Sequence, residues 1–303
     1  MGKIRKLKKA LIKIHYQCNS NCIFCWAEGN RNSKPLKFTQ IIKKIIQAQN
    51  LKADMIVLSG GEPLIHKDFF RVVDFLHQNK ISWGIATNGR VCCYKKITEQ
   101  LVKKGLRYVY FSLPSSNAQR YNAITRTPGS FEECIEGLNN LSRFNIELEI
   151  NVPVGKFNLN DLKGIVDLVK DYKISPSRAI FSLIVPRGRA LRNFKAVVSS
   201  LKKASESINQ AIDYGVSKGI NVFFTGLPDC LVKYPGLRDS LGLKEKNILY
   251  ISEVFEDKFY QTEPWQKYVK FKKCLECSRY KTCPGVYVGY KRIGAENDIK
   301  PIR

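Results

Sequence analysis

Several features are missing from this 303-residue sequence, and each absence excludes a class of protein. No apolar run approaches the roughly 18 residues that a membrane-spanning helix requires. The first ten residues are basic and precede only a short apolar run, which is not the pattern of a signal peptide. No internal repeat or low-complexity tract is present. Because aliphatic and aromatic residues make up 44% of the chain, we expect a globular, cytoplasmic protein.

Acidic residues are also scarce. The chain has 26 Asp and Glu against 51 Lys and Arg, which gives a formal net charge of +25. A charge of this size predicts an anionic partner, such as an acidic peptide, a nucleotide or tRNA. Solvated Lys-rich helices of a thermophilic protein are the alternative, although thermophiles enrich Glu together with Lys and Glu is not abundant here.

The ten cysteines are better explained by metal ligation than by disulfides, because a chain of this length does not need disulfides to be stable. Six of them form two tight triplets. The first triplet, Cys18-x3-Cys22-x2-Cys25, follows an apolar segment typical of a strand. Three thiolates on a four-iron cluster leave one iron without a protein ligand. A reaction could take place at this open iron. A zinc site or a redox-active cysteine pair is the alternative for the octapeptide taken alone.

The triplet, with Phe24 directly before its third cysteine, resembles the radical S-adenosylmethionine (radical SAM) enzymes. In that family the open iron is chelated by the methionine moiety of SAM. An electron from the cluster cleaves SAM to a 5'-deoxyadenosyl radical, which abstracts hydrogen from a substrate. The resemblance implies a 4Fe-4S cluster on Cys18, Cys22 and Cys25, with SAM positioned partly by the backbone around Phe24.

Strand-like and helix-like segments alternate along the chain up to about residue 190, as in a parallel α/β fold. The six predicted strands are 11–16, 55–58, 83–86, 108–113, 147–154 and 179–185, and a further helix and strand follow at 197–218 and 221–224. Six repeats are fewer than the eight of a closed TIM barrel. We therefore predict a partial (β/α)6 TIM-like barrel, which the radical SAM resemblance also implies, and we place a domain boundary at residue 215.

Ligands of parallel sheets bind at the carboxyl ends of the strands, and four family-like segments lie at such ends. Gly-Gly-Glu-Pro follows the second strand and matches the family's motif for binding the SAM amino group. The alternative is that this segment is only a turn, for which glycine is also suited. The resemblance implies contacts with SAM near the third and fourth strands and in a Thr-Arg-Thr-Pro-Gly segment, whose arginine would bind the SAM carboxylate. The candidate SAM-binding residues are Phe24, Gly60, Gly61, Glu62, Pro63, Asn88, Ser112 and Arg126.

The second triplet, Cys274-x2-Cys277-x5-Cys283, resembles the auxiliary-cluster domains called SPASM or twitch. Tyr287 stands where a full SPASM domain has its next cysteine, so the resemblance implies a shorter, twitch-like domain over residues 216–303 with one 4Fe-4S cluster. Cys230 is the candidate fourth ligand. A four-thiolate zinc site is one alternative; a cluster without Cys230, whose open iron contacts substrate, is another.

The remaining residues carry weaker expectations. Cys92, Cys93 and Cys134 lack partners at ligand spacing and are expected to be core or incidental residues. His15 is expected to be packed, and the segment 287–303 is expected to be a solvated terminus.

The expected function is that of a radical SAM enzyme that modifies or matures a peptide or protein. Modification of a nucleotide, tRNA or cofactor precursor is the alternative. A non-catalytic iron-sulfur protein that carries electrons or binds RNA is the alternative from another class. The expected electron donor is a ferredoxin or a flavodoxin.

Overall fold

The computed structural model describes residues 7–172, 178–238, 247–256, 258–260 and 267–303. Residues 1–6 of the basic N-terminal segment lie outside the described residues. Within the described ranges, no helix combines the length and the apolar character needed to cross a membrane.

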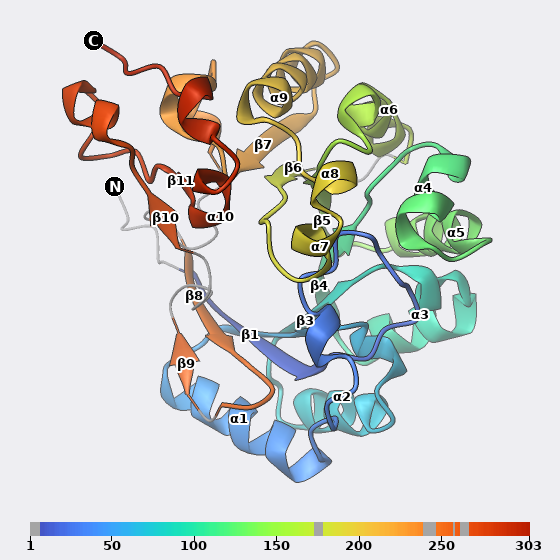
Figure 1. Ribbon diagram of the computed structural model, residues 1–303. Coiled ribbons are helices and arrows are strands. Elements are labelled where there is room, and N and C mark those ends of the chain that lie inside the picture. The colour runs from blue at the N-terminus through green and yellow to red at the C-terminus, as the bar shows by residue number, and fades with distance from the viewer. Residues whose placement is uncertain (1–6, 173–177, 239–246, 257, 261–266) are drawn as a thin grey trace, which may run out of the picture.

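A sheet of nine strands forms the centre of the molecule, in the order β7-β6-β5-β4-β3-β2-β1-β8-β9 (Figure 1). Every pair from β7 to β8 is parallel, and only β8 and β9 are antiparallel. The strands are β1 Leu7–His15, β2 Met55–Gly60, β3 Trp83–Thr87, β4 Leu106–Ser112, β5 Glu147–Val154, β6 Arg178–Leu183, β7 Asn221–Thr225, β8 Asn247–Ser252 and β9 Phe259–Tyr260. A separate antiparallel pair joins β10, Tyr268–Val269, and β11, Val286–Tyr287. The predicted partial TIM-like barrel is confirmed in β1 to β6.

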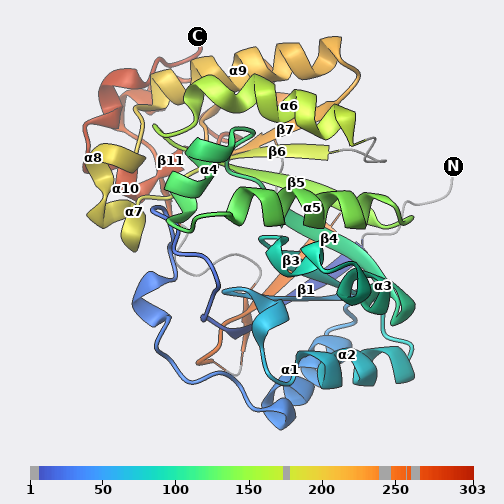
Figure 2. The same cartoon turned by 90° about the vertical axis from the view of Figure 1, so that its right-hand side faces the viewer.

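Helices between the strands cover the outer face of the sheet (Figures 1 and 2). They are amphipathic, and their apolar stripes meet the sheet. The helices are α1 Phe38–Asn50, α2 Phe69–Gln78, α3 Lys95–Lys103, α4 Ala118–Thr125, α5 Ser130–Ser142, α6 Leu162–Asp171, α7 Arg189–Arg192, α8 Phe194–Val197, α9 Leu201–Ser217 and α10 Val288–Lys291. Short 3-10 turns, among them η1 Glu28–Asn30 and η3 Arg90–Cys93, connect several of these elements.

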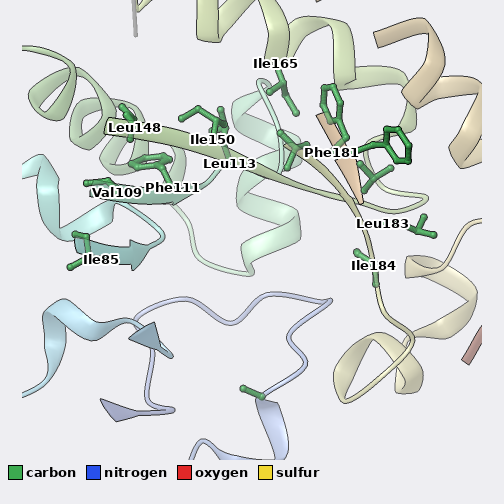
Figure 3. Close-up of a cluster of buried hydrophobic side chains, with 14 of the residues drawn as sticks. Ile85, Val109, Phe111, Leu113, Leu148, Ile150, Ile165, Phe181, Leu183 and Ile184 are labelled. Atoms are coloured by element: carbon green, nitrogen blue, oxygen red, sulfur yellow. The ribbon is translucent and has the colours of Figure 1, made fainter. Parts of the chain in front are cut away.

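The main core lies between the sheet and these helices. Alternate residues of a strand share one face, and those on the helix side are apolar and fully buried, as Val109, Phe111 and Ile150 are (Figure 3). Cys92 and Cys134 are both buried in this core, as expected.

The opposite, concave face carries charges toward the amino ends of the strands. The Lys9 ammonium lies 3.6 Å from a Glu147 carboxylate oxygen and 3.5 Å from the Tyr108 ring centroid. The Tyr108 hydroxyl donates to Glu149 at 2.8 Å, and Arg178 pairs with Glu149 at 3.4 Å. Because these groups satisfy one another, this end of the barrel interior is filled by protein rather than left open.

The C-terminal third of the chain joins the sheet at both of its ends. The proposed boundary at residue 215 falls inside α9, and beyond it β7 pairs with β6 while β8 pairs with β1 (Figure 1). The strand β8 was not predicted. The terminal segment is packed rather than solvated, since Tyr290 is fully buried and its hydroxyl donates to the Ile184 carbonyl. The expectation for 287–303 was therefore wrong, and the division into 1–215 and 216–303 stays a prediction.

Candidate active site

The cysteine loop, residues 17–27, begins where β1 ends and lies against the end of α4. The Asn21 amide donates to the Thr125 carbonyl at 2.8 Å, and the Ile23 amide donates to the Ile124 carbonyl at 2.9 Å. Within the loop the Cys25 amide donates to the Cys22 carbonyl at 3.2 Å. The loop is thus held by the barrel at the carboxyl end of the sheet, where parallel folds bind their ligands.

The three thiols lie close enough to affect one another's ionisation. Burial, with smaller contributions from neighbouring Cys18 and Cys25, raises the pKa of the Cys22 thiol to about 12. The pKa of Cys18 is raised too, chiefly by burial. Three thiolates are therefore unfavourable here unless positive metal compensates their charge, which is the chemistry of an iron-sulfur ligand set.

No group of three His, Cys, Asp or Glu side chains among the described residues surrounds a point closely enough to hold a single metal ion. A four-iron cluster differs from a single ion, because each cysteine binds a different iron. The absence of a single-ion site is therefore no argument against such a cluster, and the thiol chemistry of Cys18, Cys22 and Cys25 fits one.

The Gly-Gly-Glu-Pro segment runs directly beside the start of the cysteine loop. The Gly61 amide donates to the His15 carbonyl at 2.8 Å, and the Glu62 amide donates to the Gln17 carbonyl at 2.9 Å. A Cβ atom at Gly61 would lie 1.9 Å from the Gln17 carbonyl oxygen. Only glycine permits this approach, so the two segments are aligned by their backbones.

Glu62 ties this segment to the next strand end from a fully buried position. Its carboxylate accepts bonds from the Thr87 hydroxyl at 2.9 Å and from the Asn88 amide at 2.9 Å. The Asn88 side-chain amide in turn donates to Cys18 Sγ at 3.6 Å and to Asn19 Oδ1 at 2.8 Å. Sequence reasoning missed Thr87, although it directly precedes the candidate residue Asn88.

His15 is buried behind this network, as expected. Its ring contacts the Glu62 carbonyl through Nε2 at 2.8 Å and meets the ring of His66 edge-on at 5.1 Å. Pro63 is buried and begins a short 3-10 turn. The His15 ring therefore supports the Gly-Gly-Glu-Pro segment at Glu62.

The other candidate residues are more dispersed. Phe24 stacks on Phe157, with ring centroids 5.6 Å apart and planes at 19°, a contact that sequence reasoning missed. Ser112 is the last residue of β4 and is half-buried. Arg126 is exposed and ends α4 with a positive φ of 52°. Ser112 ends β4 and Arg126 ends the helix that follows it, so both lie toward the sheet's carboxyl end.

A buried ion pair stands beside the cysteine loop on the concave face. The Lys13 ammonium lies 2.7 Å from a Glu253 carboxylate oxygen and 4.3 Å from the Trp26 ring centroid. The Tyr16 hydroxyl also donates to Glu253. Glu253 follows the unpredicted strand β8, and no local sequence pattern indicates its position.

The second cysteine triplet and its candidate fourth ligand come together in the structure. Cys230, Cys274, Cys277 and Cys283 all line one cavity. Cys283 Sγ accepts bonds from the Asp229 and Gly285 amides at 3.3 and 3.4 Å. The Ile302 amide donates to Cys277 Sγ at 3.4 Å, so the packed terminus covers part of the site. Amide donors around sulfur are the usual surroundings of metal-bound thiolates.

The buried carboxyl of Glu62 predicts a pH dependence of stability. Burial raises the pKa of Glu62 from its ordinary 4.5 to about 7, so the folded state binds this proton more tightly than the unfolded chain. Stability should therefore fall as pH rises through this interval and level off above about 7. We expect the melting temperature of wild type to decrease between pH 5 and 7 relative to that of Glu62→Gln. If the melting temperatures of the two proteins changed equally between pH 5 and 7, the raised pKa of Glu62 would be contradicted.

Comparisons with known proteins agree with this geometry. The sequence pattern described as the Radical SAM superfamily matches residues 12–169. The AdoMet-dependent heme synthase of Methanosarcina barkeri is 27% identical over 174 residues, which are 57% of this chain and 49% of that protein. The mycofactocin maturase MftC of Mycolicibacterium smegmatis is 26% identical over 212 residues, 69% of this chain and 52% of that protein. The chain thus spans about half the length of the curated relatives it matches.

Among solved structures, Streptococcus suis SuiB bound to the precursor peptide SuiA superposes with a TM-score of 0.66 at 15% identity. The match covers 95% of this chain and 73% of that one. At this identity the likeness concerns the fold.

Proposed function

The chain belongs to the radical SAM superfamily, and on this premise we propose that it binds a 4Fe-4S cluster through Cys18, Cys22 and Cys25 and cleaves SAM there. When bound, the cluster supplies the electron that converts SAM to a 5'-deoxyadenosyl radical able to abstract hydrogen from a substrate. The observation that carries the proposal is the joining of three strand ends at the cysteine loop. The Glu62 amide bonds Gln17 at the start of the loop, the Gly61 amide bonds His15 just before it, and Asn88 bonds Cys18.

The protein's own residues would bind SAM and exclude water from it. Gly60 and Gly61 leave backbone surface free of side chains, and the Glu62 and Pro63 positions fix that surface against the sheet. Phe24 offers a flat apolar ring. We assign Ser112 to the ribose and the Arg126 guanidinium to the carboxylate of SAM, because a guanidinium suits bidentate recognition of a carboxylate.

We propose a second 4Fe-4S cluster on Cys230, Cys274, Cys277 and Cys283. It is supported by their common cavity and by the amide donors around two of the sulfurs. The position of Cys230 in that cavity favours four protein ligands, and therefore an electron relay or a structural role, over an open iron. A zinc site is the alternative, for which thiolate ligands are equally suitable.

Metal and sulfide analysis of the anaerobically purified protein tests both cluster assignments. Two clusters give about eight irons per chain, and one cluster with a zinc site gives about four irons and one zinc. Cys230→Ala should lower the iron content if Cys230 is a ligand. An unchanged iron content in Cys230→Ala would support the open-iron alternative.

We propose that the substrate is a peptide or protein. Two similar proteins support this class, since one is a mycofactocin maturase and the other was solved with its precursor peptide. The net charge of +25 favours an acidic substrate. The heme synthase relative supports the alternative, a cofactor precursor, and the charge fits a nucleotide or tRNA as well.

Substrate-dependent formation of 5'-deoxyadenosine is the decisive measurement. The reduced protein, with ferredoxin or flavodoxin as the proposed donor, would be screened against acidic peptides, nucleotides, tRNA and porphyrin precursors. Stimulation by a peptide supports the proposal. If tRNA is bound instead, its affinity should fall steeply with salt because many phosphates release counterions, whereas a short acidic peptide should be less sensitive. No 5'-deoxyadenosine under any condition would support a non-catalytic iron-sulfur protein.

A further inference from the structure

Three arginines from separate parts of the chain bind the backbone of the spacer between Cys18 and Cys22. Arg90 donates to the Asn19 carbonyl and, at 3.2 Å, to the Ser20 hydroxyl. Arg31 donates to the Ser20 carbonyl and, at 3.1 Å, to Asn21 Oδ1. Arg189 donates to the Asn21 carbonyl at 2.6 Å and to the Cys22 carbonyl at 3.1 Å. Four consecutive carbonyl groups therefore each accept a bond from a guanidinium.

The three arginines approach the loop from different elements. Arg31 follows η1 on the cysteine loop's own continuation, Arg90 begins η3 after β3, and Arg189 begins α7 after β6. The Arg189 backbone amide also donates to the Cys25 carbonyl at 3.0 Å. Gly188, before it, has a φ of 56°, and a Cβ there would lie 2.5 Å from the Trp26 carbonyl oxygen. The loop is consequently bound by residues that follow β3 and β6 as well as by its own continuation.

Charge compensation around these arginines is partial. Arg90 pairs with Glu133 at 2.6 Å, and Arg189 lies 3.4 Å from Glu28, a carboxylate that Arg192 shares. Arg31 binds the Ser20 carbonyl and Asn21 Oδ1, and it has no ion pair among the described residues. The three guanidinium groups therefore bring positive charge that is only partly neutralised to the backbone of the cysteine loop.

We propose that Arg31, Arg90 and Arg189 are positioning residues that hold the spacer in its cluster-binding conformation and stabilise added negative charge on the cluster. The inference rests on the proposed function. A guanidinium can bind two acceptors in a fixed geometry, which orders the spacer before iron enters. Nearby positive charge also favours the reduced cluster, because the reduced form carries one more negative charge.

The test compares Arg31→Gln and Arg189→Gln with a matched control, Arg192→Gln. Arg192 lies on the same helix as Arg189 and shares Glu28, but no bond joins it to the cysteine loop among the described residues. The anaerobic holoproteins are measured for the rate of iron loss to a chelator and for the reduction potential of the cluster that is absent from Cys22→Ala. We expect about tenfold faster iron loss and a more negative potential in the two loop variants. Wild-type behaviour is expected in the control.

Arg189→Lys separates the two effects, since lysine keeps the charge and loses the forked geometry. Arg189→Lys should therefore bring the reduction potential closer to the wild-type value than it brings the rate of iron loss. Loop variants that match wild type in both measurements would overturn the inference while leaving the proposed function intact. A wild-type protein that cannot be loaded with iron at Cys18, Cys22 and Cys25 would overturn the proposed function, and the role of the arginines with it.

Discussion

Replacing Cys22 by alanine is expected to abolish reductive SAM cleavage while the chain stays folded. The thiol is the middle member of the triplet, and two remaining thiolates cannot hold a cluster in the geometry that three define. The substitution removes one small side chain at the edge of the barrel and leaves the core between the sheet and helices intact. The measurement is 5'-deoxyadenosine formed by the anaerobically reconstituted, chemically reduced variant.

Cys93→Ala is the matched control for this experiment. Cys93 is only partly buried, lies outside both cysteine sets and is expected to have no ligand role. The control should retain cleavage at the wild-type rate. If Cys22→Ala still formed 5'-deoxyadenosine, the assignment of the catalytic cluster to this loop would be lost.

Gly61→Ala is expected to have the second largest effect, on both stability and activity. The added Cβ would lie 1.9 Å from the Gln17 carbonyl oxygen and 2.6 Å from the Tyr16 carbonyl oxygen, and both are backbone atoms that cannot rotate away. The segments must separate, at a cost of about 3 kcal/mol in the free energy of unfolding. A shift of about 1 Å at the start of the cysteine loop should lower SAM cleavage about 100-fold.

Gly29→Ala provides the matched control, because a Cβ at Gly29 meets nothing within 4 Å. Denaturant unfolding and the rate of 5'-deoxyadenosine formation should be unchanged in this variant. Equal stabilities of Gly61→Ala and Gly29→Ala would show that the two backbones are not held against each other in solution.

Local sequence patterns were sufficient for the elements that carry the cysteine loop. The runs that became β1 to β6 are rich in apolar residues, and the start of β2 is continuously apolar because a parallel strand is buried on both faces. Such patterns need only neighbouring residues. The Cys18, Cys22, Cys25 spacing and the Gly60–Gly61 pair are likewise local. Their expected binding roles could therefore be predicted without knowledge of the fold. A parallel sheet then places the carboxyl ends of successive strands at the same edge.

Contacts between distant segments could not be read in this way. Glu253 pairs with Lys13, which is 240 positions away in the sequence. The three arginines that bind the cysteine loop follow η1, β3 and β6. The terminus packs on Cys277 although its sequence is rich in polar residues. Each of these contacts forms only when distant segments of the chain pack together in the folded protein.

The sequence by itself determined the family resemblance, the candidate thiol ligands and the barrel order of the first six strands. The tertiary structure decided that β8 pairs with β1, that the candidate Cys230 lines the same cavity as the second triplet, and that arginines bind the cysteine loop. The physical reason is the separation along the sequence of the residues that interact. Periodicity, turns and ligand spacing are set by residues a few positions apart, whereas strand pairing and ion pairing are set by the packing of segments that no local pattern relates.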